Sequence, residues 1–195
     1  MGLVVIVVSI LNLSTFCRKK KIPNVESNQT VCIPEIHTTA ASKAGTHIVE
    51  ATKDITVVDT VVYANLIAGK EYTVRGTLMN KATGEAMLDD SGKEITAETT
   101  FVAETPNGSV DVTFVFSGVT LAGKTMVAFE QMFMESQIVA THADIEDEDQ
   151  TIYIPKIGTT LTDEDGKKTV DPMEEVKLVD EVSYSNLIPG KAYAL

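Results

Sequence analysis

The sequence has no tryptophan, only two cysteines and a shortage of basic residues, and each shortage excludes a class of protein. Lys and Arg number 16 against 28 Asp and Glu, a net charge of −12 that argues against nucleic acid or an anionic membrane as a partner. Cys17 and Cys32 both precede the periodic part of the chain, which excludes a disulfide framework for the main body. No Cys/His set has the spacing of a zinc site, and we expect no cofactor.

An apolar run, GLVVIVVSILNLSTFC, opens the chain, and the basic stretch CRKKK follows it. The run is short for a membrane-spanning helix, and it lacks the preceding basic region of a signal peptide. A membrane anchor, a damaged signal and a wrongly assigned start all remain open as interpretations. We therefore treat residues 1–31 as a poorly defined apolar segment and linker.

From about residue 32 onward, apolar and polar residues alternate, which predicts strands with one buried face. The segments DITVVDTVVY and SVDVTFVF show the pattern well, and turn sequences such as NKATGE and TPNGS separate such segments. No stretch shows the apolar stripe of an amphipathic helix. About eight to ten short strands in roughly 120 residues predict an all-β, immunoglobulin-like antiparallel β-sandwich.

The chain also repeats itself. Residues 36–74 align without a gap with residues 157–195, at an offset of 121 positions and with 15 identities in 39. Such self-similarity is typical of a tandem repeat array. We therefore expect one complete β-sandwich domain at 32–155, followed by the truncated start of a second repeat at 156–195.

Strand alternation places several polar side chains on core-facing positions: Thr38, Asp59, His142 and Gln150. A buried carboxylate is costly unless it is paired, so Asp59 needs a partner. A threonine hydroxyl and a glutamine amide are a nucleophile and an acyl group, and the first and last strands of such a sandwich can be neighbours. With a histidine and carboxylates to move and orient a proton, the set has the composition for acyl transfer.

The order of the motifs resembles one family. The tetrapeptide VAFE lies in TMVAFEQMF, with DTVVYANLIAGKEYTVRGTLMNKATGEAM before it and HADIEDEDQT after it. This order resembles the VaFE repeat, the Thr–Gln ester-bond domain of Gram-positive surface adhesins, over residues 34–155 and again, truncated, over 156–195. The resemblance implies that a threonine hydroxyl attacks a glutamine side-chain carbonyl, that ammonia leaves, and that an ester joins the first and last strands.

The resemblance also implies roles for five residues: Thr38 as nucleophile, Gln150 as acyl donor, His142 as proton carrier, and Asp59 and Glu130 as the acids that orient and polarise the site. Thr39 is the alternative nucleophile, and the shared parity of Thr38 with apolar neighbours favours Thr38. The other acids of HADIEDEDQT are too many for catalysis, and we interpret them as a solvated turn.

The implied function is a structural stalk module of an adhesin on the outer surface of a bacterial cell wall. Its partners would be neighbouring repeats of the same chain, with no small-molecule substrate, and its chemistry would run once per molecule, so it would not be an enzyme. The alternative is a module that binds a host protein or glycan through its loops without a cross-link. A hydrolase is disfavoured because no glycine-rich nucleophile elbow is present. A Lys–Asn isopeptide bond is disfavoured because the opening strand carries Thr38 in place of a lysine and the closing strand carries Gln150 in place of an asparagine. A Cys–Gln thioester is a weaker alternative, which would use Cys32, near the first strand.

Overall fold

The computed structural model describes residues 33–170 and 175–194, so expectations for residues 1–31 and for Cys32 lie outside the described part. Within that part the chain forms ten strands and two short 3-10 helices. In chain order they are β1 (Glu35–Ser42), β2 (Ile55–Ala64), β3 (Glu71–Asn80), β4 (Thr96–Val102), β5 (Gly108–Phe116), η1 (Val119–Leu121), β6 (Thr125–Met134), β7 (Gln137–His142), η2 (Glu148–Gln150), β8 (Thr151–Tyr153), β9 (Lys156–Asp163) and β10 (Leu178–Ser185).

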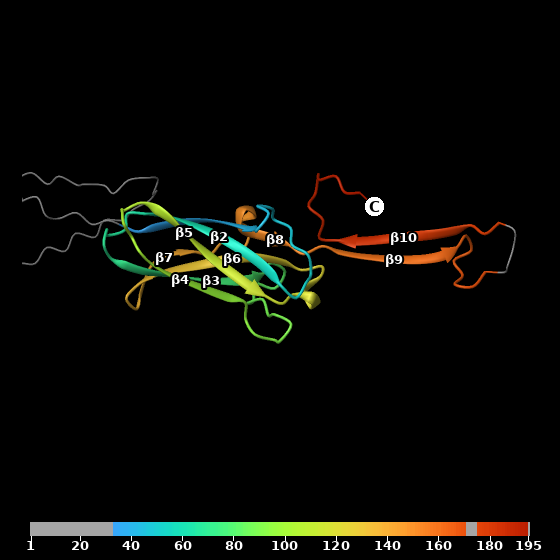
Figure 1. Ribbon diagram of the computed structural model, residues 1–195, viewed down its shortest axis with the longest axis horizontal. Coiled ribbons are helices and arrows are strands. Elements are labelled where there is room, and N and C mark those ends of the chain that lie inside the picture. The colour runs from blue at the N-terminus through green and yellow to red at the C-terminus, as the bar shows by residue number, and fades with distance from the viewer. Residues whose placement is uncertain (1–32, 171–174, 195) are drawn as a thin grey trace, which may run out of the picture.

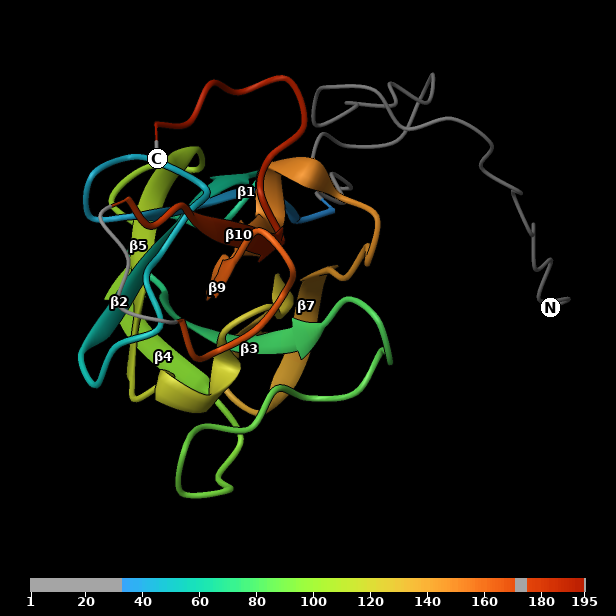
Figure 2. The same cartoon turned by 90° about the vertical axis from the view of Figure 1, so that its right-hand side faces the viewer.

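Two antiparallel sheets form a sandwich from the first eight strands (Figure 1). One sheet has the order β1-β2-β5, and the other has the order β4-β3-β6-β7, with β8 pairing with β6. Viewed from the end that carries the β9–β10 hairpin, β2 and β5 lie to one side and β3 and β7 to the other (Figure 2). The predicted all-β sandwich is therefore confirmed.

The alternating residues of the strands build the core between the sheets. Every second residue of β2 from Ile55 to Tyr63 is buried, and in β5 Val112, Phe114 and Phe116 are buried while the residues between them are exposed. This alternation follows from the pleat, which points successive side chains to opposite faces. The position of Asp59 among the buried residues of β2 means that the core contains a carboxyl group.

The β9–β10 hairpin extends beyond the sandwich along the long axis of the molecule (Figure 1). Its register reproduces that of the first hairpin at the repeat offset, because Lys156 pairs with Ser185 as Glu35 pairs with Ala64. The face that corresponds to the core face of β1 and β2 is largely exposed in this hairpin, with Ile157 59% and Tyr184 67% exposed. The sequence repeat is thus also a repeat of strand pairing.

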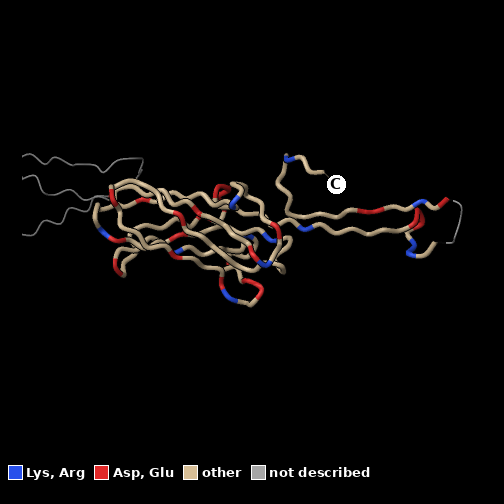
Figure 3. The backbone as a smooth tube through the Cα atoms, in the orientation of Figure 1, with Lys and Arg blue, Asp and Glu red and all other residues tan. Residues whose placement is uncertain are grey.

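Acidic residues are spread along the described chain, and Lys and Arg are interspersed among them instead of forming one basic patch (Figure 3). Within residues 33–170 and 175–194, no helix is long and apolar enough to cross a membrane.

Candidate functional site

Four polar side chains meet in the core of the sandwich, and they come from both sheets. Thr38 lies on β1, Asp59 on β2, Glu130 on β6, and Gln150 at the end of η2. Thr38 is 6% exposed, and the other three are fully buried. Buried polar groups require partners, so these four must satisfy one another.

Strand pairing explains why Thr38 and Asp59 are neighbours. In the β1–β2 ladder, Thr38 pairs with Val61 and Ala40 pairs with Asp59. Thr38 and Asp59 are therefore diagonal neighbours on one face of the sheet, within reach of the same group. Thr39, the alternative nucleophile, is exposed on the opposite face.

The hydroxyl of Thr38 links the amide to a carboxyl group. Its Oγ1 donates a hydrogen bond to Oε2 of Glu130 at 3.1 Å, and it accepts one from Nε2 of Gln150. The same amide nitrogen donates to Oδ1 of Asp59 at 3.3 Å. The hydroxyl that would attack and the amide that would be attacked are therefore in direct contact, although 112 positions separate them in the sequence.

The two carboxyl groups perturb each other. Burial is the largest cause that raises the pKa of Glu130 to about 10, followed by the charge of Asp59 and hydrogen bonding to it. Burial also raises the pKa of Asp59, against the opposing effects of Glu130, Gln150 and the charge of His142. Since two like charges are not stable together in a low-dielectric interior, the pair holds one proton near neutral pH, mainly on Glu130.

Three oxygens of this cluster accept no hydrogen bond from a donor group of the described residues: Asp59 Oδ2, Glu130 Oε1 and Gln150 Oε1. One proton held between the two carboxyl groups would satisfy the carboxyl oxygens. The Gln150 carbonyl oxygen then remains, and it is the atom on which negative charge would develop during attack on the amide.

His142 lies next to the four residues but does not bond to them. It pairs with Glu130 in the β6–β7 ladder, so the two side chains share a face. Its Nε2 lies 2.8 Å from Oδ2 of Asp147, and its side chain is 19% exposed. Strand alternation predicts that Ile138 shares the face of His142, but this is wrong: a register shift between Met132 and Phe133 leaves Ile138 52% exposed.

Asp147 was not identified from the sequence. Besides contacting His142, it caps η2, because its Oδ1 accepts a hydrogen bond from the backbone N–H of Asp149 at 2.9 Å. The only sequence signal is its place in a run of five acids, and nothing in that run distinguishes it. Among the described residues, no group of three or more His, Cys, Asp or Glu side chains has the arrangement of a metal site.

The fold and this cluster define a class of protein: an antiparallel β-sandwich with a threonine and a glutamine in contact beside two buried carboxyl groups. The chain belongs to the T-Q ester bond containing domain family, whose model matches residues 34–154 and again 155–195. The resemblance inferred from the sequence motifs is thereby confirmed.

Known structures share the fold. Two structures of a bacterial adhesin from Mobiluncus mulieris, described as containing intramolecular disulfide, isopeptide and ester bond cross-links, match with TM-scores of 0.53 and 0.52. They are 19% and 18% identical to this chain, and each match covers 77% of this chain and 75% of the adhesin chain. Comparison with curated protein sequences gives no match.

Proposed function

We propose that this chain is a structural module of a bacterial surface adhesin, and that its first domain cross-links itself through an ester between Thr38 and Gln150. The observation that carries the proposal is the buried contact between the Thr38 hydroxyl and the Gln150 amide, with Glu130 and Asp59 bonded to them. Membership of the family supports the chemistry, and the shared fold with the Mobiluncus mulieris adhesin supports the setting.

In the proposed reaction, Thr38 Oγ1 attacks the side-chain carbonyl carbon of Gln150. Oε2 of Glu130 already accepts the hydroxyl hydrogen bond and takes the proton, while the proton held by Glu130 passes to Asp59. Asp59, which accepts a hydrogen bond from the Gln150 amide nitrogen, then protonates that nitrogen. The C–N bond breaks, and ammonia leaves with the proton that Asp59 delivered. Glu130 keeps the former hydroxyl proton, so the carboxyl pair again holds one proton, as it did at the start.

His142 and Asp147 would assist these proton transfers, although neither side chain is hydrogen-bonded to Thr38 or Gln150. His142, the predicted proton carrier, has a side chain that is 19% exposed, whereas the two carboxyl groups are fully buried. Asp147 holds the ring of His142. A positive charge on His142 also lowers the pKa of Asp59, which favours the ionised form that receives a proton. General acid–base groups of this kind typically contribute about 10²–10⁴-fold to a rate.

The cross-link would give the module mechanical strength. It joins β1, the first strand, to the segment before β8, so a pulling force would pass through covalent bonds instead of the hydrogen-bonded ladders. Closing a loop of 112 residues restricts the unfolded chain and would stabilise the domain by about 4–5 kcal/mol on the loop-entropy argument used for disulfides. The reaction consumes side chains of the domain itself, so it occurs once per molecule and the domain does not act as an enzyme.

We assign residues 32–155 to the complete cross-linking domain and residues 156–195 to the start of a second copy. Thr159 and Asp180 of the second copy correspond to Thr38 and Asp59 at the repeat offset, but both are exposed. We therefore expect one ester in this chain. The likeness to the adhesin supports a module that acts outside the cell as part of a stalk, with neighbouring repeats as its partners.

Intact mass under denaturing conditions tests the proposal. The parent chain is expected to be lighter than its sequence by one ammonia, and the Thr38→Ala and Gln150→Ala variants are expected to have their full sequence mass. Thr39→Ala serves as the matched control and should still lose ammonia. A parent chain with its full sequence mass would contradict the proposed function.

A further inference from the structure

A very short element delivers Gln150 to Thr38. Gln150 is the last residue of η2, which has three residues, and β8 after it has three more. A single 3-10 turn has little stability of its own, because its few hydrogen bonds do not offset the entropy of ordering the chain. The position of the Gln150 amide must therefore depend on side chains that hold the residues beside it.

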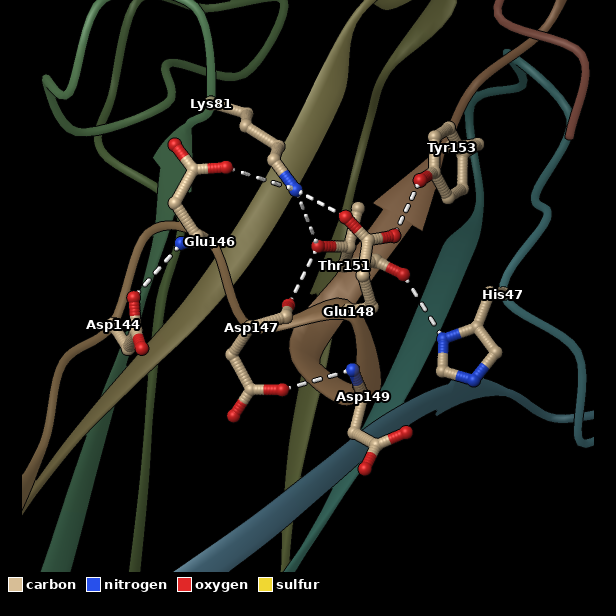
Figure 4. Close-up of polar contacts among 9 residues, drawn as sticks. All are labelled: His47, Lys81, Asp144, Glu146, Asp147, Glu148, Asp149, Thr151 and Tyr153. Atoms are coloured by element: carbon tan, nitrogen blue, oxygen red, sulfur yellow. Dashed lines mark hydrogen bonds and ion pairs between the residues drawn. The ribbon is translucent and has the colours of Figure 1, made fainter. Parts of the chain in front are cut away.

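Lys81 holds residues on both sides of Gln150. It directly follows β3, and its backbone N–H donates to the carbonyl of Thr125 at 3.0 Å, which fixes it to the start of β6. Its Nζ lies 2.7 Å from Oε1 of Glu148 and 3.3 Å from Oγ1 of Thr151 (Figure 4). The side chain of Lys81 is only 20% exposed, so it spans from the sheet to the turn with little freedom.

The two partners of this lysine are themselves bonded to the domain (Figure 4). The second carboxylate oxygen of Glu148 accepts a hydrogen bond from the hydroxyl of Tyr153 at 2.7 Å. The hydroxyl of Thr151 donates to the carbonyl of Asp147 at 2.7 Å, and the carbonyl of Thr151 lies 3.0 Å from Nδ1 of His47. Lys81 is thus part of a hydrogen-bond network around η2 and β8 that does not include the reacting side chains.

Lys81 also opposes the negative charge of this turn. Five of the ten residues from 142 to 151 are acidic, and among the described residues Lys81 is the one Lys or Arg side chain that pairs with any of them. Its Nζ also lies 3.9 Å from Oε2 of Glu146. Without this cation the like charges would repel one another and favour a more open turn.

We propose that Lys81 is a positioning residue for ester formation, an inference that rests on the proposed function. It touches none of the reacting atoms, and it acts by holding the turn so that the Gln150 amide stays against the Thr38 hydroxyl. The rate of such an intramolecular reaction depends steeply on placement, and a displacement of about 1 Å can cost about 100-fold. Loss of Lys81 should therefore slow ester formation by about ten-fold to 100-fold.

The rate can be followed on the full chain made by cell-free translation. Samples are quenched in denaturant at intervals, and the linear and cross-linked forms are separated by denaturing electrophoresis and identified by intact mass. The test variant is Lys81→Met, with Lys81→Arg as the rescue. Lys70→Met is the matched control, because Lys70 is exposed and lies at the opposite end of β3 from Lys81. Lys70→Met is expected to react at the parent rate, and Lys81→Arg to recover most of it.

A second measurement separates positioning from folding. In a Thr38→Ala background, where no ester forms, the thermal midpoint of the Lys81→Met variant is compared with that of the chain that keeps Lys81. The rate of ester formation is then measured, in chains that keep Thr38, well below both midpoints. Lys81→Met reacting at the parent rate would overturn the proposal, as would a slowing that only matches its unfolded fraction. If Lys81→Arg formed the ester as slowly as Lys81→Met, the positive charge at position 81 would not have the role proposed for it. A parent chain that forms no ester would instead overturn the proposed function itself.

Discussion

The carboxyl groups of Asp59 and Glu130 interact across the two sheets, one carried by β2 and the other by β6, and neither side chain is exposed. Such a pair is costly to bury with two charges but much less costly with one shared proton. The raised pKa of Glu130 identifies it as the main holder of that proton. The pair therefore has both an acid and a base available at the point where a hydroxyl and an amide meet.

Glu130→Gln is expected to prevent the cross-link and to leave the fold intact. Glutamine resembles the protonated glutamic acid in shape and charge, so burial of the new side chain should be tolerated, but it cannot take the Thr38 proton. Intact mass is expected to show the full sequence mass, and circular dichroism should match that of Thr38→Ala. A Glu130→Gln chain that is one ammonia lighter than its sequence would contradict the role assigned to Glu130.

The stability of the uncross-linked domain is expected to fall as pH rises. Unfolded Glu130 would lose its proton above its ordinary pKa of 4.5, whereas the folded domain keeps that proton up to about pH 10. Unfolding therefore releases a proton throughout this window, and the free energy of unfolding should fall by at most about 1.4 kcal/mol per pH unit. Urea denaturation of Thr38→Ala between about pH 5 and 9 measures the slope.

Adding Glu130→Gln to that background supplies the control, because glutamine does not titrate. The difference in slope between the two variants measures the titration of Glu130 together with its effect on Asp59, and it removes the contribution of groups elsewhere in the domain. Equal slopes would show that Glu130 does not keep a proton in the folded domain.

Strand alternation was enough to place Thr38 and Asp59 in the core, because β1 and β2 each have one buried and one more accessible face. It was not enough for Glu130. Val127 and Ala128, on opposite faces of β6, are both buried, and β8 pairs with the start of this strand, so the apolar pattern there has no single core face. Only the motif order of the family identified Glu130 from the sequence.

The surroundings of His142 were still less predictable. The register shift in the β6–β7 ladder changes which residues of β7 share a face, and a one-residue shift reverses the direction of every side chain beyond it. The choice of Asp147 among five neighbouring acids depends on the fold of one short turn. Both features come from tertiary pairing, which the local pattern does not encode.

Asp147→Asn should slow ester formation by about ten-fold or more if His142 moves protons as proposed. Asparagine keeps an oxygen that can cap η2, but it lacks the carboxylate charge that pairs with the imidazole of His142. The time course of cross-linking in cell-free translation measures the effect. Asp144→Asn is the matched control, since it removes the same charge from the same run without touching His142. Equal rates for the two variants would argue against a role for the Asp147–His142 pair.

Gly76 is expected to be required for core packing beside the site. It pairs with Glu130 in the β3–β6 ladder, and a Cβ at this position would overlap Cζ of the buried Phe114 ring. In a strand, alanine would by itself be favoured over glycine by about 0.5–1 kcal/mol. Because the Phe114 ring is fully buried in the core, overpacking should dominate, and Gly76→Ala should destabilise the Thr38→Ala background by about 1–3 kcal/mol.

A double-mutant cycle tests the cause of this loss. Phe114→Leu shortens the side chain that Gly76→Ala would meet, so the two changes together should cost less than the sum of the single changes, by about 0.5–3 kcal/mol. Thr77→Ala, one residue along on the outer face of β3, serves as the control for a general effect of alanine. Additive losses for Gly76→Ala and Phe114→Leu would show that the glycine is needed for a reason other than its contact with this ring.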